Sequence, residues 1–116
     1  MSDGRKRYRR GAEAERLCGK ILERAGYWVI RAAGSRGVVD LVALRPGRVL
    51  GIQVKRGRSP WPPPHELLEW EAKAGGKGIL AVYLGHRGWI FCRPTRQGWE
   101  QFEPIWAKEV KQCVAG

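Results

Sequence analysis

The chain has 116 residues and a formal net charge of +11, from 22 lysines and arginines against 11 acidic residues. This length fits one domain with a single core, and 43% hydrophobic residues with six tryptophans exclude an intrinsically disordered chain. No apolar run approaches the ~20 residues that cross a bilayer, and no apolar segment follows the basic N-terminus as in a secretory signal. We therefore expect an intracellular, cytoplasmic protein with no membrane partner. The positive charge points to a polyanion such as nucleic acid, although a merely basic soluble protein would carry the same charge.

Three cysteines, Cys18, Cys92 and Cys113, are odd in number and widely spaced, and no Cys-x-x-Cys pair occurs. This spacing predicts buried thiols in a reducing compartment rather than a disulfide framework or a zinc site.

The first ten residues are expected to form a basic N-terminal arm, and residues 11–116 a single domain. From about Gly11 to Ala25, apolar residues recur at helical spacing, and Gly26 suits a C-terminal cap. The stripe consists of Ala14, Leu17, Cys18, Ile21, Leu22 and Ala25. A second helix is predicted from about His65 to Ala74, after a proline-rich segment that we interpret as a rigid surface connection. A third helical stripe includes Phe102 and continues over Ile105–Val114.

Five segments rich in β-branched, aliphatic and aromatic residues predict strands. They are Tyr27–Ala32, Val38–Leu44, Val49–Lys55, Ile79–Leu84 and Trp89–Arg93. The order of helices and strands predicts an α/β or α+β sandwich around a central mixed five-stranded sheet flanked by helices, and of these two classes we expect α/β.

The second and third strands are predicted to form an antiparallel hairpin that turns at Pro46-Gly47. Cross-strand partners then have numbers that sum to 93, which places Asp40 opposite Gln53, with Lys55 on the same face. A slip of one residue would bury the charged residues and expose the aliphatic ones, so this register is favoured. The core-facing set is Val39, Leu41, Ile52 and Val54.

A carboxylate, an amide oxygen and an ammonium group at one end of a sheet suit metal-dependent phosphodiester hydrolysis. The alternative is an ordinary polar face of an amphipathic hairpin, although aspartate is disfavoured inside a strand. Glu15 lies beside the apolar stripe of the first helix and has no cationic residue three or four positions away. It could complete a metal site or be a solvated surface glutamate.

Four segments together carry a resemblance to a known family. They are Gly11-Ala12-Glu13-Ala14-Glu15-Arg16, the stretch from Gly26 to Ser35, Val39-Asp40-Leu41-Val42-Ala43, and Ile52-Gln53-Val54-Lys55. In order and spacing, over roughly residues 8–93, the chain resembles the archaeal-type Holliday junction resolvases of the PD-(D/E)xK nuclease superfamily. The resemblance implies a restriction-endonuclease-like core, Mg²⁺ as cofactor with Mn²⁺ as substitute, and a homodimer that cuts branched, four-way DNA by paired symmetric nicks.

The same resemblance implies roles for individual residues. Asp40, residue 53 and the Val54 carbonyl would hold the metal, Lys55 would position the attacking water, and Glu15 would be an additional acid. Arg16 and Arg31 would contact phosphate or order the site, and Ser35 would lie in a loop near the scissile strand.

Phosphate contacts are expected from the basic arm and from basic residues around the site. The complete set of DNA-binding candidates is Arg5, Lys6, Arg7, Arg9, Arg10, Arg16, Arg31, Ser35, Arg36, Arg56 and Arg58. The alternative for the arm is a frayed, solvated tail. Trp89, Trp99 and Trp106 are compatible with a dimer interface or with simple core packing.

Gln53 departs from the family pattern, which carries glutamate at this position. Glutamine keeps one ligand oxygen but removes a negative charge, so metal affinity should fall. Three interpretations stay open: a natural variant that still cleaves, a decayed site that only binds junctions, and an inactivating Glu-to-Gln change. We favour the active variant because Asp40, Lys55 and Glu15 persist. A related small nuclease acting on other branched or mismatched DNA is the other enzymatic alternative.

Overall fold

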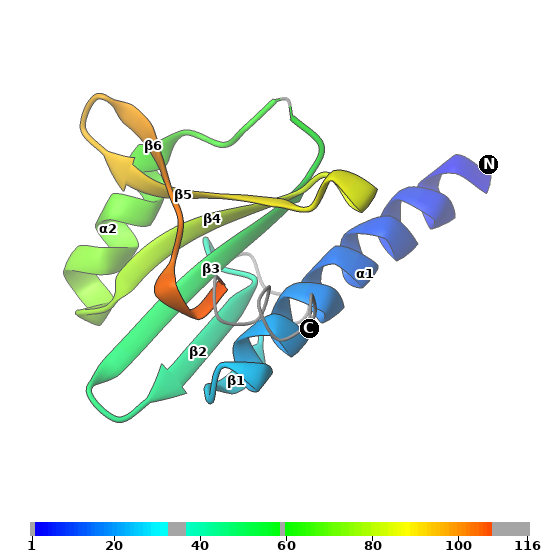
Figure 1. The fold of residues 1–116 in the computed structure, drawn as a ribbon. Coiled ribbons are helices and arrows are strands. Elements are labelled where there is room, and N and C mark those ends of the chain that lie inside the picture. The colour runs from blue at the N-terminus through cyan, green and yellow to red at the C-terminus, as the bar shows by residue number, and fades with distance from the viewer. Residues whose placement is uncertain (1, 33–36, 59, 108–116) are drawn as a thin grey trace.

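The computed structural model describes residues 2–32, 37–58 and 60–107, with only the backbone described over residues 2–10. Two complete helices, six strands and a 3-10 turn follow one another in these ranges (Figure 1), and residues 105–107, at the start of the predicted third helix, are helical. They are α1 (Ser2–Arg24), β1 (Trp28–Arg31), β2 (Leu41–Arg45), β3 (Arg48–Arg56), α2 (Pro64–Ala74), β4 (Lys77–Tyr83), η1 (Gly85–Arg87), β5 (Trp89–Thr95) and β6 (Gly98–Phe102).

The six strands form one sheet in sequence order, β1-β2-β3-β4-β5-β6. All neighbours are antiparallel except β3 and β4, which are parallel and joined through α2. The predicted α/β class and mixed sheet are confirmed, whereas the predicted count of five strands is wrong. We missed β6 because Phe102, Ile105 and Trp106 also fall at helical spacing, and Phe102 in fact ends a strand. Residues 108–114 of the predicted third helix, and Cys113 with them, lie outside the described residues.

The first helix begins at Ser2, nine residues before the predicted start near Gly11, and runs without a break across residue 10. The apolar stripe starts only at Ala14, so hydrophobic periodicity carries no signal over the basic residues before it. Arginine and lysine nevertheless have high helix propensity, which favours continuation of the helix through that segment.

The core occupies both faces of the sheet. Beneath α1, Cys18 and Leu22 pack with Leu41 and Ile52 in the larger of two buried clusters, and these side chains are all fully buried. On the other face, Leu80, Val82 and Cys92 form the smaller cluster, against which Trp61 and Trp99 pack. Cys18 and Cys92 are free and buried, as the sequence predicted.

The proline-rich segment before α2 braces the second face of the sheet. Pro63 is the extended N-cap residue and Pro64 opens the helix, a position where the missing N–H costs nothing. The indole Nε1 of Trp99 donates a hydrogen bond of 2.8 Å to the Pro62 carbonyl. The segment is therefore a rigid connection, as expected, whose Trp61 is also part of the packing.

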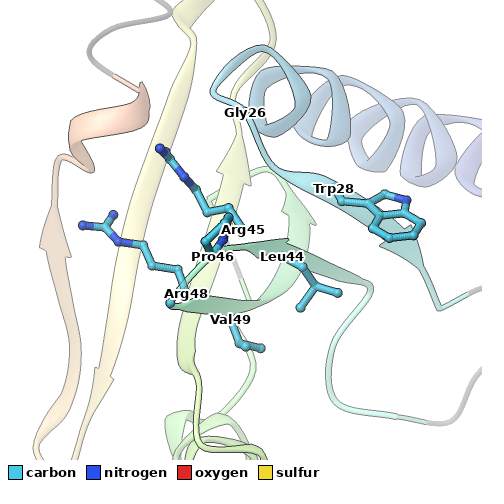
Figure 2. A pocket seen from close by; sticks show the side chains of 8 residues that line it. Gly26, Trp28, Leu44, Arg45, Pro46, Arg48 and Val49 are labelled. Atoms are coloured by element: carbon cyan, nitrogen blue, oxygen red, sulfur yellow. The ribbon is translucent and has the colours of Figure 1, made fainter.

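Helix α2 covers only part of this second face. It packs against β4 and β5, and the ring of Trp70 lies over Gly51 of β3. On the β1–β2 side, Trp28 and Ile30 remain 75% and 48% exposed, and they pair in register with Leu44 and Val42. Figure 2 shows Leu44 and Val49 on the opposite side of the β2–β3 hairpin from Arg45 and Arg48. We call Trp28, Ile30, Val42, Leu44 and Val49 the open apolar face. Within the described part of the chain, no helix has the length and apolar character needed to span a membrane.

A glycine is required where α2 crosses β3. A Cβ built on Gly51 would lie 2.5–2.7 Å from three ring atoms of Trp70, so Gly51→Ala should destabilise the fold by about 1–3 kcal/mol through overpacking. Gly11→Ala is the matched control, because no atom lies within 4 Å of its built Cβ and alanine in a helix should gain about 1 kcal/mol. Thermal unfolding should move the two midpoints in opposite directions. A neutral Gly51→Ala would contradict the packing described above.

Candidate active site

The β2–β3 hairpin has the predicted register. Its pairs run from Leu41 opposite Ile52 to Arg45 opposite Arg48, and every pair sums to 93. Strand β2 begins at Leu41 rather than at the predicted Val38, so Asp40 stands just before it, and its N–H donates to the Ile52 carbonyl at 2.8 Å. The predicted core-facing positions Leu41 and Ile52 are fully buried, which confirms the assignment of the two faces.

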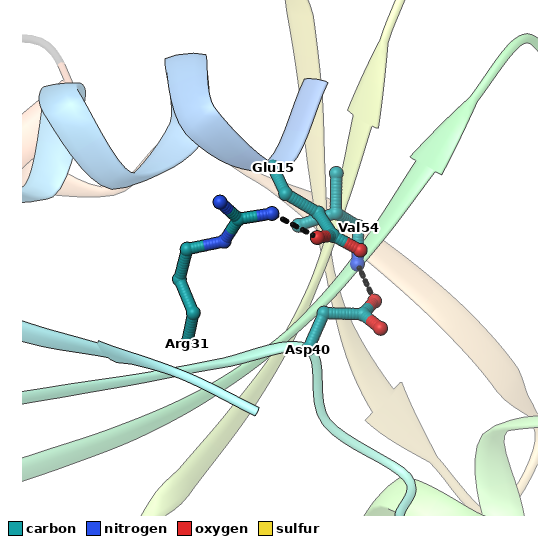
Figure 3. Close-up of polar contacts among 4 residues, drawn as sticks. All are labelled: Glu15, Arg31, Asp40 and Val54. Carbon is teal, nitrogen blue, oxygen red and sulfur yellow. Dashed lines mark hydrogen bonds and ion pairs between the residues drawn. The ribbon is translucent and has the colours of Figure 1, made fainter. Parts of the chain in front are cut away.

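The Asp40 carboxylate is held by the backbone of β3. That strand continues to Arg56, beyond Ile52, which pairs with the first residue of β2. The Val54 N–H therefore lies beyond the last β2–β3 pair. Asp40 Oδ2 accepts a hydrogen bond from this N–H at 2.8 Å (Figure 3). Because the N–H and C=O of one strand residue point to the same side, the Val54 carbonyl also faces the Asp40 side of β3.

Glu15 reaches the same place from α1. Its Oε2 lies 3.1 Å from Nη2 of Arg31, at the end of β1, and its side chain is only 28% exposed. Figure 3 shows the Glu15 carboxylate between Arg31 and the Asp40–Val54 contact. The sequence places no cationic residue three or four positions from Glu15 on its own helix, and the structure supplies Arg31, which lies 16 residues further along the chain on β1. Sequence reasoning had no local signal for this ion pair.

The surroundings of Asp40 oppose its ionisation. Burial raises the pKa of the Asp40 carboxyl, the Val54 N–H acts against this rise, and the Glu15 carboxylate adds to it. Cys18 lies three residues after Glu15 on α1. Burial together with the Asp40 charge raises the pKa of the Cys18 thiol to about 12. Cys18 is therefore a neutral packing residue under the site.

Gln53 and Lys55 alternate with Val54, so both lie on the face of β3 opposite α1. The Gln53 Oε1 atom is buried and has no hydrogen-bond partner among the described residues. Lys55 is half-buried and forms no ion pair with any described residue. A buried oxygen without a donor is uncommon in native proteins and calls for an explanation, which a bound cation would provide.

The oxygen donors fit a hard cation such as Mg²⁺, which takes carboxylate, carbonyl and amide oxygens and retains several waters. The available donors are the Asp40 carboxylate, the orphaned Gln53 Oε1 and the Val54 carbonyl. Within the described ranges, nowhere do three or more His, Cys, Asp or Glu side chains gather as a metal-ligating cluster. The candidate site is thus rich in oxygen but poor in negative charge.

The structure describes the side chains of three other predicted DNA-binding residues. Arg16, Arg56 and Arg58 are exposed, and the Arg56 guanidinium stacks over the Tyr83 ring at 5.2 Å. Ser35 and Arg36 lie outside the described residues. The same holds for the side chains of Arg5, Lys6, Arg7, Arg9 and Arg10.

Comparisons with known proteins identify the family and the fold. The model of a family described as archaeal Holliday junction resolvase (Hjc) matches residues 6–104. A crossover junction endodeoxyribonuclease Hjc from Methanocaldococcus jannaschii is 49% identical over 51 residues, which are 44% of this chain and 38% of that relative. The crystal structure of Hjc, a Holliday junction resolvase from Archaeoglobus fulgidus, has a TM-score of 0.61 and 22% identity, covering 86% of this chain and 88% of that one. This likeness shows the same fold.

The raised pKa of Asp40 predicts a pH-dependent effect of Asp40→Asn on stability. Between the ordinary value of 3.8 and the higher folded value, the native state binds more protons than the unfolded state, so wild-type stability falls as pH rises. Asparagine keeps an acceptor for the Val54 N–H without the charge. In metal-free buffer, Asp40→Asn should therefore melt up to a few degrees higher at pH 8, with the gain vanishing near pH 4.

Glu69→Gln, at an exposed position of α2, is the control that should show no such pH-dependent difference. An Asp40→Asn melting difference that is constant from pH 4 to pH 8 would contradict the assigned electrostatics.

Proposed function

The chain belongs to the archaeal Holliday junction resolvase family, and from this membership and the site we propose that it is a structure-selective DNA endonuclease that resolves four-way junctions. The observation that carries the proposal is the Asp40 carboxylate fixed on the Val54 N–H of β3, the strand that also carries Gln53, whose buried amide oxygen has no partner among the described residues. Such a substrate exists where the cell keeps its DNA, so we propose an intracellular, cytoplasmic location.

We assign Mg²⁺, with Mn²⁺ as its substitute, to the oxygens of Asp40, Gln53 and Val54. When bound, the ion would activate a water and offset negative charge on the phosphate. Lys55 has no ionic partner among the described residues, so its ammonium is available to hold the attacking water or a phosphate oxygen. Glu15, held by Arg31, adds a second carboxylate at the edge of the site.

The exposed guanidinium groups of Arg16, Arg56 and Arg58 suit contacts with phosphates of the junction arms. The same role is proposed for Arg31, Ser35 and Arg36 and for the basic residues Arg5, Lys6, Arg7, Arg9 and Arg10 at the N-terminus. These contacts carry no base-specific readout, so recognition would rest on the shape of the junction and weaken steeply with salt.

Gln53 favours a second candidate function, a junction-binding protein that does not cut. The amide provides one ligand oxygen but no charge, and it leaves Asp40 as the only carboxylate in the proposed inner set of ligands. A related nuclease that cuts other branched or mismatched DNA is distinguished from a resolvase by the substrate alone.

We propose that the protein acts as a homodimer through the open apolar face. The three tryptophans that the sequence suggested for a dimer interface make contacts within the chain. Trp106 is buried in the core, Trp89 packs against the core, and the Trp99 indole donates a hydrogen bond to the Pro62 carbonyl. By contrast, Trp28 is 75% exposed on the edge strand β1. Two chains of net charge +11 repel each other, and an uncharged patch is where they can approach. A second copy can cover the same patch on both subunits by two-fold symmetry.

An immobile four-way junction, labelled on each strand in turn and incubated with Mg²⁺ or Mn²⁺, tests the proposed activity. Paired nicks in opposing arms are expected. Asp40→Ala and Lys55→Ala should each lower the cleavage rate by at least about 100-fold while junction binding persists. Lys73→Ala, which removes an exposed lysine from α2, should cleave normally.

Preferred cutting of flap or mismatched DNA would favour the related nuclease, and tight binding without product in either metal would favour the junction-binding protein. Unchanged cleavage by Asp40→Ala would contradict the assigned site.

Sedimentation of Trp28→Glu/Ile30→Glu tests the dimer. The wild type should sediment at twice the mass of the 13.1 kDa chain, and the double variant, whose positions are exposed, should be a folded monomer. Ile105→Glu is the control, because Ile105 is 69% exposed but lies outside the open apolar face. A wild type that stays monomeric at micromolar concentration, or a double variant that stays dimeric, would contradict this interface.

A further inference from the structure

The last residue of β3, Arg56, lies over an aromatic ring of the neighbouring strand. Its guanidinium carbon is 5.2 Å from the centroid of the Tyr83 ring on β4, within the ~6 Å range of a cation–π contact. Arg56 is exposed and forms no ion pair with any described residue. The guanidinium is therefore supported on one face by the ring and open to solvent on the other.

The Tyr83 ring is itself held in place by a row of aromatic side chains. Its centroid is 4.8 Å from that of Trp89, its cross-strand partner on β5, and Trp89 stacks on Phe91 at 6.0 Å. Phe91 is 4% exposed and belongs to the larger core cluster. The backbone is fixed as well, because the Gly57 N–H, directly after Arg56, donates to the Tyr83 carbonyl at 3.0 Å. We call Arg56, Tyr83 and Trp89 the stacking platform.

The stacking platform lies next to the candidate active site. Arg56 follows Val54, whose N–H holds the Asp40 carboxylate, by two residues, so the two side chains share one face of β3 and are about 6.6 Å apart along the strand. Tyr83 shares that face, since Ala81, two residues before it on β4, is buried in the cluster beneath α1. A nucleotide whose phosphate lies at the site can therefore place its base on the platform.

An exposed guanidinium plane backed by an aromatic ring is suited to bind a nucleobase. Arginine planes and aromatic rings stack bases that leave a helix, and every base has a π-face, so the contact requires no particular sequence. Inside a duplex, a base reaches such a platform only after it leaves its stack, which costs free energy. At the branch point of a four-way junction the strands change partners, so stacking is interrupted and this cost is lower.

We propose that the stacking platform receives an unstacked base at the branch point, beside the scissile phosphate, and so helps the protein to distinguish a junction from a continuous duplex. A phosphate contact by Arg56 needs only a charge, which lysine shares, whereas stacking needs the plane of the guanidinium. The inference rests on the proposed function, since it requires a DNA junction at the site.

Arg56→Lys separates the two roles, because lysine keeps the charge and has no plane to stack. Binding to a four-way junction, measured in EDTA so that no strand is cut, should weaken by at least about fivefold, the lower end for one stacked base. Binding to a duplex of the same length should be unchanged. Arg93→Lys is the matched control: the Arg93 guanidinium also lies over a ring, that of Phe102 at 4.2 Å, but four residues beyond Trp89 on β5. Both affinities should keep their wild-type values in this control.

Substitutions of Tyr83 test the support beneath the guanidinium. Tyr83→Leu removes the ring and should reproduce the loss of junction binding seen in Arg56→Lys. Tyr83→Phe keeps the ring and should recover most of the affinity that Tyr83→Leu loses. Thermal unfolding checks that each variant is folded, and Arg56→Lys, which changes an exposed side chain, keeps the test valid even if Tyr83→Leu is less stable.

The decisive experiment is a double-mutant cycle between protein and DNA. In junctions of one sequence, an abasic nucleotide replaces in turn each nucleotide that flanks the branch point. At one of these positions, the abasic nucleotide should weaken wild-type binding by about the same factor as Arg56→Lys does. The two changes together should then weaken binding no more than either does alone, because both remove the same contact.

Wild-type affinity of Arg56→Lys for the junction would overturn the inference, and so would an equal loss of affinity for junction and duplex, which indicates a phosphate contact. Losses that multiply at every position of the cycle would also overturn it. A protein that prefers and cuts junctions, but whose preference persists in Arg56→Lys, keeps the proposed function and loses the stacking platform. A wild type with no preference for junctions over duplex would contradict both.

Discussion

The hydrogen bond between the Asp40 carboxylate and the Val54 N–H is the contact on which the site depends. It forms because β3 extends past the first residue of β2, which leaves a backbone donor for a side chain rather than for a strand. The bond turns the carboxylate toward the side of β3 where the Val54 carbonyl points. A register shift of one residue would move Asp40 to the core face and break this contact, so the buried pair Leu41 and Ile52 maintains the site as well as the fold.

The surroundings of this hydrogen bond disfavour the negative charge of Asp40. Burial and the Glu15 carboxylate both raise the pKa of Asp40, and only the Val54 N–H opposes them. The Glu15–Arg31 ion pair joins α1 to the end of β1 and limits the repulsion between the two carboxylates. Cys18, fully buried below, adds no charge of its own. Burial and repulsion therefore disfavour the charged form of Asp40, a cost to stability that fits the catalytic role proposed for this residue.

The parts of the fold that follow from alternation were predictable, and the parts that follow from distant contacts were not. Two-residue periodicity on both sides of Pro46-Gly47 was enough to predict the hairpin register, because one face is buried. The partner of Glu15 could not be predicted, since Arg31 approaches it through the tertiary fold. Strand β6 was missed because its last residue, Phe102, fits a helical stripe with the residues after it. The basic start of α1 has no apolar pattern to detect.

The whole chain has a net charge of +11, whereas the charged candidate residues Glu15, Asp40, Arg31 and Lys55 carry two negative and two positive charges that cancel. Under the proposed function, the exposed arginines would attract the DNA backbone over a distance of about 10 Å at moderate salt, whether or not a metal is bound. A carboxylate at position 53 would attract a cation, whereas the Gln53 amide provides a buried oxygen without a charge. If the phosphate arrives first, it meets Lys55 without the repulsion that a second inner carboxylate would cause. Under the proposed function, the neutral amide of Gln53 would therefore hold a free cation more weakly than a carboxylate would, and it would repel an approaching phosphate less.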